Sequence, residues 1–255
     1  MKISAVIIAF NEEAKIAEAI RSVAWADEVL VVDSESTDGT QEIAGNLGAR
    51  VIVEKWRGFA AQKQFAADAA ANDMIISIDA DERVTPELRD EIIAIRDAGK
   101  PADGYRIPRL SHYMGRPIRH GGWYPDWQLR LFDRRKAKWK DVVIHESIEL
   151  AEGAAVSHLK GDLLHFSVDS VADHAAMIQD RYAPLGARAR FDKGRSVSVL
   201  QIVFTPPLTF LSNYILQAGF LDGFPGFCIA YFAAYNVFLK YLLVWEMQIS
   251  DKSSS

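Results

Sequence analysis

Apolar and polar positions form alternating short blocks through the first hundred residues. Continuous apolar runs of strand length are followed by segments in which apolar residues recur at helical spacing. The predicted strands are residues 3–9, 29–32, 51–53 and 74–78, and the predicted helices lie near residues 12–23, 43–47, 58–71 and 86–95. Strands without a polar face are typical of parallel sheets that are buried on both sides. The pattern therefore predicts an α/β fold, a mostly parallel sheet with helices on both faces.

The pattern changes twice in the remainder of the chain. Residues 104–166 consist of short strands and turns rich in aromatic and basic side chains, and residues 170–192 predict an amphipathic helix. From Ser196 the chain is strongly apolar as far as Trp245. We therefore expect one α/β domain over residues 1–195, divided near residue 100 into halves 1–100 and 101–195. Apolar C-terminal helices are expected over residues 196–255.

Composition narrows the possible partners. The net charge of −5 gives no general attraction to nucleic acid, and no nucleic-acid partner is expected. Residues 101–200 nevertheless carry 16 basic against 12 acidic side chains, so an anionic partner is expected there. The single cysteine, Cys228, excludes an internal disulfide or a cysteine zinc cluster and predicts a buried structural thiol. Met1 and Lys2 lead directly into an apolar strand without a secretory leader, which predicts a cytoplasmic catalytic part.

Polar clusters follow three of the predicted strands. They are residues 11–13, 33–38 and 79–82, and ligands of parallel sheets bind beyond such carboxyl ends. In the third cluster Asp79 and Asp81 are one residue apart, so in extended chain both side chains point to the same side. Two such carboxylates suit a divalent cation, Mg²⁺ or Mn²⁺, with positions left for phosphate oxygens. A solvated turn with a helix-capping aspartate is the alternative.

Three segments, in this order along the chain, resemble glycosyltransferase family 2. They are residues 6–12 (VIIAFNE), 31–40 (VVDSESTDGT) and 78–82 (IDADE). The resemblance implies the Rossmann-like fold called GT-A and inverting transfer from a nucleotide sugar. It also implies donor contacts from Phe10, Asn11, Glu12, Asp33 and Asp79. Many family members have a second aspartate where this chain has Ser34, so a turn-stabilising role for Asp33 stays open.

A closer resemblance is to the branch that contains lipopolysaccharide-core β-1,4-glucosyltransferases. The segments are residues 56–64 (WRGFAAQKQ), 79–84 (DADERV), 127–132 (WQLRLF) and 144–146 (IHE). This resemblance implies UDP-glucose as donor and a lipopolysaccharide-core or other lipid-linked saccharide as acceptor, at the cytoplasmic face of the bacterial inner membrane. Other UDP-hexoses and polyprenyl-linked or capsular acceptors remain open.

An inverting transfer needs a general base for the acceptor hydroxyl, and Asp126 is the candidate. It lies in Trp123-Tyr124-Pro125-Asp126-Trp127, where the family has its catalytic acidic motif. The flanking tryptophans are expected to form an apolar wall that raises the pKa of Asp126, and to offer a platform for a sugar ring. A surface-turn aspartate beside core aromatics is the alternative.

The resemblance implies further ligands of the metal and the diphosphate. Asp81 is the expected direct metal ligand, supported by Asp79. His145 resembles the downstream histidine that completes such sites, and His165 is its rival. Arg130, on the Asp126 side of a strand, is expected to pair with phosphate, unless it forms an ordinary salt bridge. Lys63 is a further candidate for donor contact.

The apolar C-terminal segment predicts attachment to an anionic membrane surface. No charged residue occurs from Ser196 to Leu221, but Pro206-Pro207 argues against one straight helix. An aromatic stripe follows at helical spacing: Phe224, Phe227, Tyr231, Tyr235, Phe238, Tyr241 and Trp245. Basic side chains precede the segment, as beside an anionic membrane: Arg181, Arg188, Arg190, Lys193 and Arg195. Peripheral or re-entrant attachment is predicted; core helices are the alternative.

Two other functions compete with sugar transfer. A nucleotidyltransferase of related fold would carry a glycine-rich, basic phosphate loop after its first strand, whereas this chain has the acidic sequence Phe10-Asn11-Glu12-Glu13. A non-catalytic membrane adaptor with a degenerate transferase domain is the second alternative. The intact Asp79, Asp81 and Asp126 argue against it.

Overall fold

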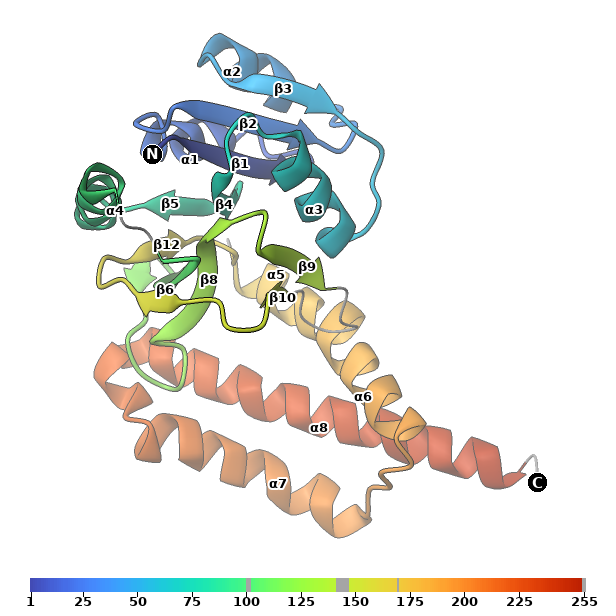
Figure 1. Ribbon diagram of the computed structural model, residues 1–255. Coiled ribbons are helices and arrows are strands. Elements are labelled where there is room, and N and C mark those ends of the chain that lie inside the picture. Colours follow the sequence, from blue (N-terminus) through green and yellow to red (C-terminus); the bar gives the residue numbers. More distant parts are fainter. Residues whose placement is uncertain (100–101, 141–146, 169, 254–255) are drawn as a thin grey trace. The chain divides into compact units, whose positions relative to one another are not determined.

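The computed structural model describes residues 1–99, 102–140, 147–168 and 170–253 (Figure 1). The chain forms two compact units. The first unit comprises Met1–Leu110 and Asp126–His165, and the second comprises Ser111–Pro125 and Phe166–Ser255.

The first unit is built on one large sheet with the strand order β3-β2-β1-β4-β8-β6-β12-β5. Its parallel part consists of β1 (Ile3–Ala9), β2 (Glu28–Asp33), β3 (Arg50–Val53) and β4 (Met74–Asp79). All four strands are among the apolar runs that the sequence predicts. Antiparallel pairs extend the sheet through β5 (Glu82–Val84), β6 (Gly104–Tyr113), β8 (Asp126–Asp133) and β12 (Leu163–His165).

Three short elements complete the strands of the chain. β11 (Val156–His158) pairs with β6 in parallel, and β7 (Arg116–Pro117) pairs with the end of β6 in the second unit. β9 (Ala137–Lys140) and β10 (Ser147–Leu150) form a separate antiparallel pair.

Helices cover both faces of the sheet, as the sequence predicts. α1 (Ile16–Ser22), α2 (Thr40–Asn46) and α4 (Pro86–Ala98) bury apolar side chains against one face, and α3 (Phe59–Ala69) covers the other. On β1, Ile7 faces the first group of helices and Val6 faces α3. Consecutive strand residues point to opposite faces, so an apolar strand serves both layers.

The second unit contains the helices of the C-terminal segment. They are α5 (Val171–Ala176), the π-helical turn η1 (Met177–Tyr182), α6 (Ala183–Asp192), α7 (Val199–Leu211), η2 (Ser212–Leu216), η3 (Gly219–Asp222) and α8 (Gly223–Ser253). α7 and α8 form a hairpin through η2 and η3 (Figure 1). The helix runs on through Pro206 and Pro207 and continues as η2, so the apolar stretch reverses after Leu216 rather than at the prolines.

The observed division of the chain does not coincide with the predicted boundary at residue 195. Residues 166–195 belong to the second unit together with the apolar helices. Ala187 of α6 shares a small core with Ile202 of α7 and Val244 of α8. Burial of these side chains couples α6 to the hairpin, whereas the sequence suggested a change of composition at Ser196.

Candidate active site

The loops after β1 and β2 are joined by hydrogen bonds. Asn11 has a φ of +53°, a conformation that asparagine tolerates, and its backbone N–H donates to Ser36 Oγ at 2.8 Å. Its side-chain Oδ1 accepts from the Thr37 N–H at 2.8 Å. The Glu12 N–H donates to Thr40 Oγ1 at 2.8 Å. Phe10, in contrast, is more than half exposed. Two of the polar clusters predicted from the sequence therefore form one surface at the carboxyl ends of β1 and β2.

Asp33 is buried at the end of β2, and its carboxylate accepts hydrogen bonds from the following turn and from α2. Its carboxylate accepts from the Ser36 N–H at 2.9 Å, from Ser36 Oγ at 2.5 Å and from Gln41 Nε2 at 2.6 Å. Ser34 is also buried and accepts from Gln62 Nε2 of α3 at 3.2 Å. These hydrogen bonds show that Asp33 stabilises the turn. Its contact with a nucleotide stays a prediction.

Asp79 lies between two buried cations at the end of β4. Lys63 Nζ of α3 is 2.9 Å from Asp79 Oδ1, and Arg130 Nη2 of β8 is 2.9 Å from Oδ2. Burial by itself raises the pKa of Asp79, but the charges and hydrogen bonds of Lys63 and Arg130 together hold it well below its usual range. Lys63 also lies 5.0 Å from the centroid of the Trp139 ring. Lys63 and Arg130, predicted as donor contacts, are both engaged with Asp79.

Glu82 is a central side chain of this region that the sequence reasoning did not single out. It is fully buried, and its Oε1 accepts from Arg130 Nη2 at 2.7 Å and lies 3.3 Å from Arg109 Nη1. Its Oε2 accepts from the Asp79 N–H at 3.0 Å. The signal was present, because Glu82 directly follows the Asp79-Ala80-Asp81 motif.

Asp126 begins β8 and has two side-chain partners. Arg109 of β6, its register partner, donates to Oδ2 from Nε at 2.9 Å and from Nη2 at 2.6 Å. Gln128 Nε2 donates to Oδ1 at 2.7 Å. Arg109 is a second residue that the sequence reasoning missed. We use the term ion-pair chain for the continuous series of contacts that runs through Lys63, Asp79, Arg130, Glu82, Arg109 and Asp126.

Of the two tryptophans that flank Asp126 in the sequence, Trp127 does not have the predicted arrangement. Trp127 is exposed and packs edge-on against His158, with ring centroids 4.8 Å apart. It faces away from Asp126 because consecutive strand residues point to opposite sides. Trp123 belongs to the second unit and packs against Tyr113 and His174. Trp127 therefore does not form the predicted apolar wall, and a guanidinium and an amide hold the Asp126 carboxylate. The part of Trp123 in such a wall stays a prediction.

Asp81 is paired with a histidine. His165 Nε2 of β12 lies 3.5 Å from Asp81 Oδ2. Burial by itself raises the pKa of Asp81. The hydrogen bond and the charge of His165 outweigh this effect, so the pKa of Asp81 lies below its usual value. His145, the other histidine predicted for this role, lies outside the described residues. A carboxylate and an imidazole are both ligands of divalent metals, and their closeness fits a shared ion. Among the described residues there is no group of three potential ligands, so phosphate oxygens or water would have to complete the coordination.

Comparison with known proteins identifies the family. The family described as glycosyl transferase family 2 matches residues 4–148, which include strands β2 to β6, β8 and both aspartates of the Asp-x-Asp motif. The chain belongs to glycosyltransferase family 2. It is therefore an enzyme of the glycosyltransferase class. The predicted fold class, a mostly parallel sheet with helices on both faces, is confirmed by the strand pairing and the two core layers.

Several relatives of this family 2 chain are similar over nearly the whole length. The lipopolysaccharide core biosynthesis glycosyltransferase LpsC of Rhizobium meliloti (strain 1021) is 30% identical over 100% of this chain and 98% of its own length. The uncharacterized glycosyltransferase RT0209 of Rickettsia typhi is 32% identical over 99% of this chain and 89% of its own.

Solved structures show more distant similarity. S. aureus TarS 1–349 in complex with UDP-GlcNAc has a TM-score of 0.49 and 16% identity, covering 98% of this chain and 92% of that one. Glucosyl-3-phosphoglycerate synthase from Mycobacterium tuberculosis in complex with phosphoglyceric acid has a TM-score of 0.48 and 20% identity, covering 73% and 79%.

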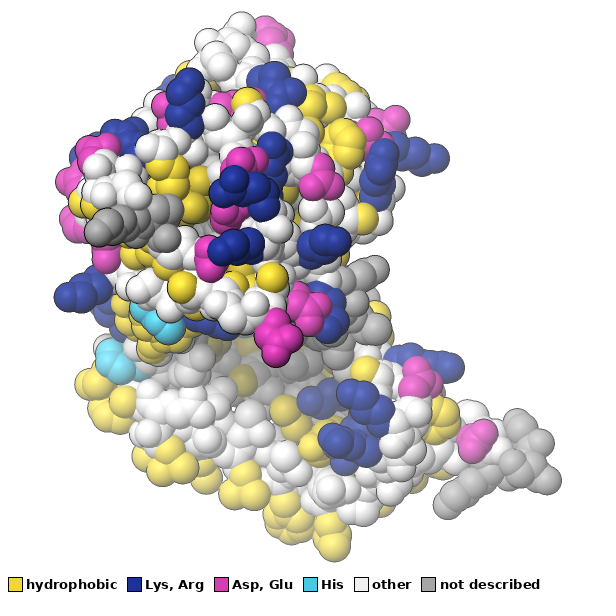
Figure 2. Space-filling model, in the orientation of Figure 1, with side chains coloured by type: hydrophobic (Ala, Val, Ile, Leu, Met, Phe, Trp, Pro, Cys, Tyr) yellow, Lys and Arg dark blue, Asp and Glu magenta, His cyan; other side chains and the backbone are white. Residues whose placement is uncertain are grey.

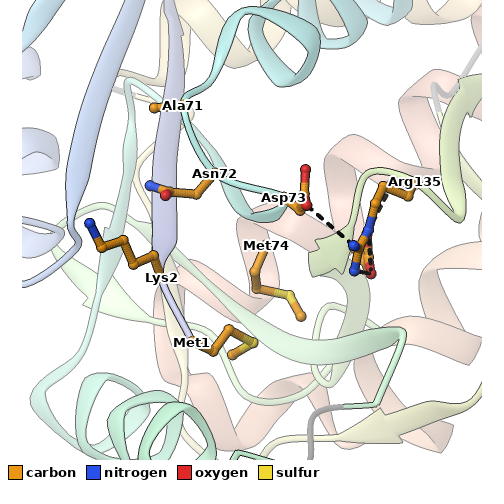
Figure 3. Close-up of a pocket in the computed structure, with 8 residues that line it drawn as sticks. Met1, Lys2, Ala71, Asn72, Asp73, Met74 and Arg135 are labelled. Atoms are coloured by element: carbon orange, nitrogen blue, oxygen red, sulfur yellow. Dashed lines mark hydrogen bonds and ion pairs between the residues drawn. The ribbon is translucent and has the colours of Figure 1, made fainter.

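A depression of about 320 Å³ on this family 2 domain lies away from the candidate site (Figure 3). It is lined by Met1, Lys2 and residues 71–74, at the amino ends of β1 and β4. Arg135 in its lining contacts both Asp73 and Asp133. Donor-binding residues of parallel sheets lie at the opposite, carboxyl ends.

Glu82→Gln is expected to destabilise the domain by about 3 kcal/mol in urea-induced unfolding, the low end of the cost of breaking a buried ion pair. The loss stays at the low end because Arg130 retains Asp79 and Arg109 retains Asp126. The matched control is Glu149→Gln, which removes an exposed carboxylate 3.4 Å from Lys140 and should leave the unfolding midpoint unchanged. Equal midpoints for the two variants would contradict a structural role for the ion-pair chain.

Proposed function

We propose that this family 2 enzyme transfers a hexose with inversion from a UDP-sugar, UDP-glucose first, to a lipopolysaccharide-core or other membrane glycolipid acceptor. The observation that carries the proposal is the ion-pair chain, which joins the Asp-x-Asp motif of β4 to Asp126 of β8 within one unit. The name of the relative LpsC, a lipopolysaccharide core biosynthesis glycosyltransferase, supports the class of acceptor.

On the donor side, we assign Asp81 and His165 as ligands of a divalent cation, Mg²⁺ or Mn²⁺. When bound, such an ion neutralises the charge that grows on the departing diphosphate. Asp79 lies one residue from Asp81 and is held by Lys63 and Arg130, so its negative charge is already balanced by the protein. We therefore assign Asp79 to orientation of the donor or of water, and Asp81 to the direct metal contact.

On the acceptor side, we assign Asp126 as the general base. Its carboxylate accepts the proton of the acceptor hydroxyl while that oxygen forms a bond to the anomeric carbon. The bond from the anomeric carbon to the diphosphate oxygen breaks in the same step, with the electron pair leaving on the diphosphate, so the configuration inverts. Arg109 and Gln128 hold the two carboxylate oxygens in place, and each oxygen keeps capacity for a further hydrogen bond.

The nucleotide contacts are assigned to the surface formed by the loops after β1 and β2. Phe10 offers an exposed ring, and Asn11 and Glu12 set the shape of the loop through their bonds to Ser36 and Thr40. Asp33 stabilises the same surface by accepting a hydrogen bond from Ser36 Oγ. Family membership decides against the nucleotidyltransferase alternative.

We further propose peripheral or re-entrant attachment to the cytoplasmic face of the bacterial inner membrane. Two helical stretches, Val199–Leu216 and Gly219–Asp251, are long and apolar enough to cross a membrane, judged by length and composition alone. Little of either stretch is buried. The basic side chains that precede α7 suit an anionic lipid surface.

A donor and acceptor screen tests the proposal. The purified full-length chain is incubated with UDP-glucose, UDP-galactose or UDP-GlcNAc, extracted core glycolipids, and Mg²⁺, Mn²⁺ or EDTA. We expect metal-dependent transfer of glucose and a β-linked product, because inversion of an α-linked donor gives the β anomer. An α-linked product would contradict the mechanism. Absence of both transfer and donor hydrolysis with every UDP-sugar would favour the non-catalytic adaptor.

A further inference from the structure

The hairpin turn between α7 and α8, defined here as residues 208–224, exposes an unusual amount of apolar surface. Leu216 is 82% exposed, and no charged residue occurs between Ser196 and Leu221. The exposed large apolar side chains of the turn are Leu208, Leu211, Ile215, Leu216, Phe220, Leu221 and Phe224. Figure 2 shows hydrophobic side chains along the outer edge of this hairpin. Contiguous apolar surface of this kind marks an interaction site.

Aromatic rings of the hairpin turn and of the start of α8 pack against one another. Phe210 lies 5.4 Å from Tyr214 and 5.5 Å from Phe227, measured between ring centroids. Tyr214 also packs edge-on against Phe220 at 6.3 Å. Phe224 and Phe227 are stacked at 6.2 Å. The turn therefore contains a packed aromatic cluster beside its exposed aliphatic side chains, and aromatic rings are enriched where proteins meet the membrane interface.

The charges around this surface suit a lipid bilayer as its occupant. Arg116 and Arg119 are exposed on the segment beside the hairpin turn, and Arg119 lies over the Tyr124 ring at 5.3 Å. At the other end of α7, exposed basic side chains precede the helix: Arg188, Lys193 and Arg195. An uncharged apolar face with cations at both ends matches acyl chains bordered by anionic headgroups.

The hairpin turn also holds the segment that leads to Asp126. The backbone N–H groups of Arg119 and His120 donate to Asp222 Oδ2 at 3.2 and 2.8 Å, and His120 Nδ1 lies 2.9 Å from Asp222 Oδ1. The Gly121 N–H donates to the Gln217 carbonyl at 2.9 Å. Gly122 has a φ of +80°, and a Cβ there would collide with the Gln217 side chain.

We infer that the hairpin turn binds the apolar interface of an anionic bilayer, and that the Asp222 contacts couple this binding to the segment 119–125 and so to turnover. Only residues 123–125 separate Gly122 from Asp126. A bilayer that orders the turn restricts the motion of residues 119–121, because their backbone N–H groups donate to Asp222 and Gln217 of the turn. The coupling rests on the proposed function, whereas the lipid binding does not.

Lipid binding is tested by sedimentation of the full-length chain with phosphatidylglycerol-containing vesicles. We expect Leu216→Glu/Leu221→Glu to weaken vesicle binding by about tenfold or more, because two exposed leucines no longer enter the apolar interface. Leu47→Glu, a change of a partly exposed leucine in the first unit, is the matched control and should bind as wild type does. Both variants should keep the wild-type melting temperature, since the altered side chains are exposed.

Two results would overturn the lipid assignment. Unchanged vesicle binding of Leu216→Glu/Leu221→Glu would show that another surface meets the bilayer. The second result has three parts: the wild type does not bind vesicles, it elutes as a dimer in size-exclusion chromatography, and the double variant elutes as a monomer. This result would show that a second copy covers the turn.

The coupling is tested with a de-acylated core oligosaccharide as acceptor, so that the vesicles do not deliver the acceptor. We expect anionic vesicles to raise wild-type turnover about fivefold or more, the usual lower range of coupling between two sites. Asp222→Asn should bind vesicles as wild type does but lose this stimulation, because its amide holds the two N–H groups and His120 less well. Wild-type turnover that vesicles do not change would overturn the coupling. Absence of any transfer by wild type, with vesicle binding intact, would instead contradict the proposed function.

Discussion

Asp126→Asn is expected to lower turnover by about 10²–10⁴-fold, the range for loss of a positioned general base. The amide has nearly the size of the carboxylate and can still accept a hydrogen bond from Arg109. It cannot take a proton from the acceptor hydroxyl. Because the assigned metal ligands are Asp81 and His165, UDP-sugar and metal affinities should stay near wild type. Single-turnover kinetics and calorimetric donor titration measure the two effects separately.

The same variant distinguishes catalysis from a structural role of Asp126. Its side chain is 36% exposed and lies at the end of the ion-pair chain, so the melting temperature should change little. Asp97→Asn, on the exposed side of α4, is the control and should be active. A clear loss of thermal stability with a modest loss of rate would indicate a turn-stabilising aspartate. If donor binding disappears together with turnover, the base must be sought elsewhere.

Asp81→Asn is expected to abolish metal-dependent donor binding as well as transfer. A neutral amide binds a divalent cation poorly, and the metal contributes several kcal/mol to stabilisation of the departing charge. Each 1.36 kcal/mol corresponds to a factor of ten, so turnover should fall by about 10³-fold or more. Binding of Mn²⁺ and UDP, followed by calorimetry and by electron paramagnetic resonance, gives a readout that does not depend on activity.

His165→Ala provides a parallel test of the metal assignment. It should weaken Mn²⁺ binding in the presence of UDP, because it removes the side chain 3.5 Å from the Asp81 carboxylate. For the companion variant Asp81→Asn, full transfer activity at a limiting metal concentration would contradict the assignment of Asp81 as a metal ligand. Normal Mn²⁺ binding by His165→Ala would contradict the assignment of His165 as a metal ligand and would favour His145 for this role.

Asp33 and Asp79 show that a local motif identifies a site more readily than it assigns roles within it. The sequence predicted donor contact for Asp33, which stays a prediction, whereas the structure shows three hydrogen bonds to its carboxylate from Ser36 and Gln41. Asp79 was predicted to support the metal, yet Lys63 and Arg130 balance its charge. In each case the partner is set by burial and by neighbouring side chains, which a short motif does not contain.

The sequence alone determined the order of the strands and helices, the covered parallel sheet, and the edge at which the polar clusters lie. These follow from periodicity and from strand ends, which are local properties of the chain. Only the tertiary structure joined Glu82 to Arg109 and Arg130, because these residues are 27 and 48 positions apart and meet through antiparallel pairing of β8 with β4 and β6. It also brought His165 to Asp81 and joined α6 to the apolar hairpin. Contacts between distant segments depend on strand register and on burial of both partners, and neither is encoded in the spacing of residues along one segment.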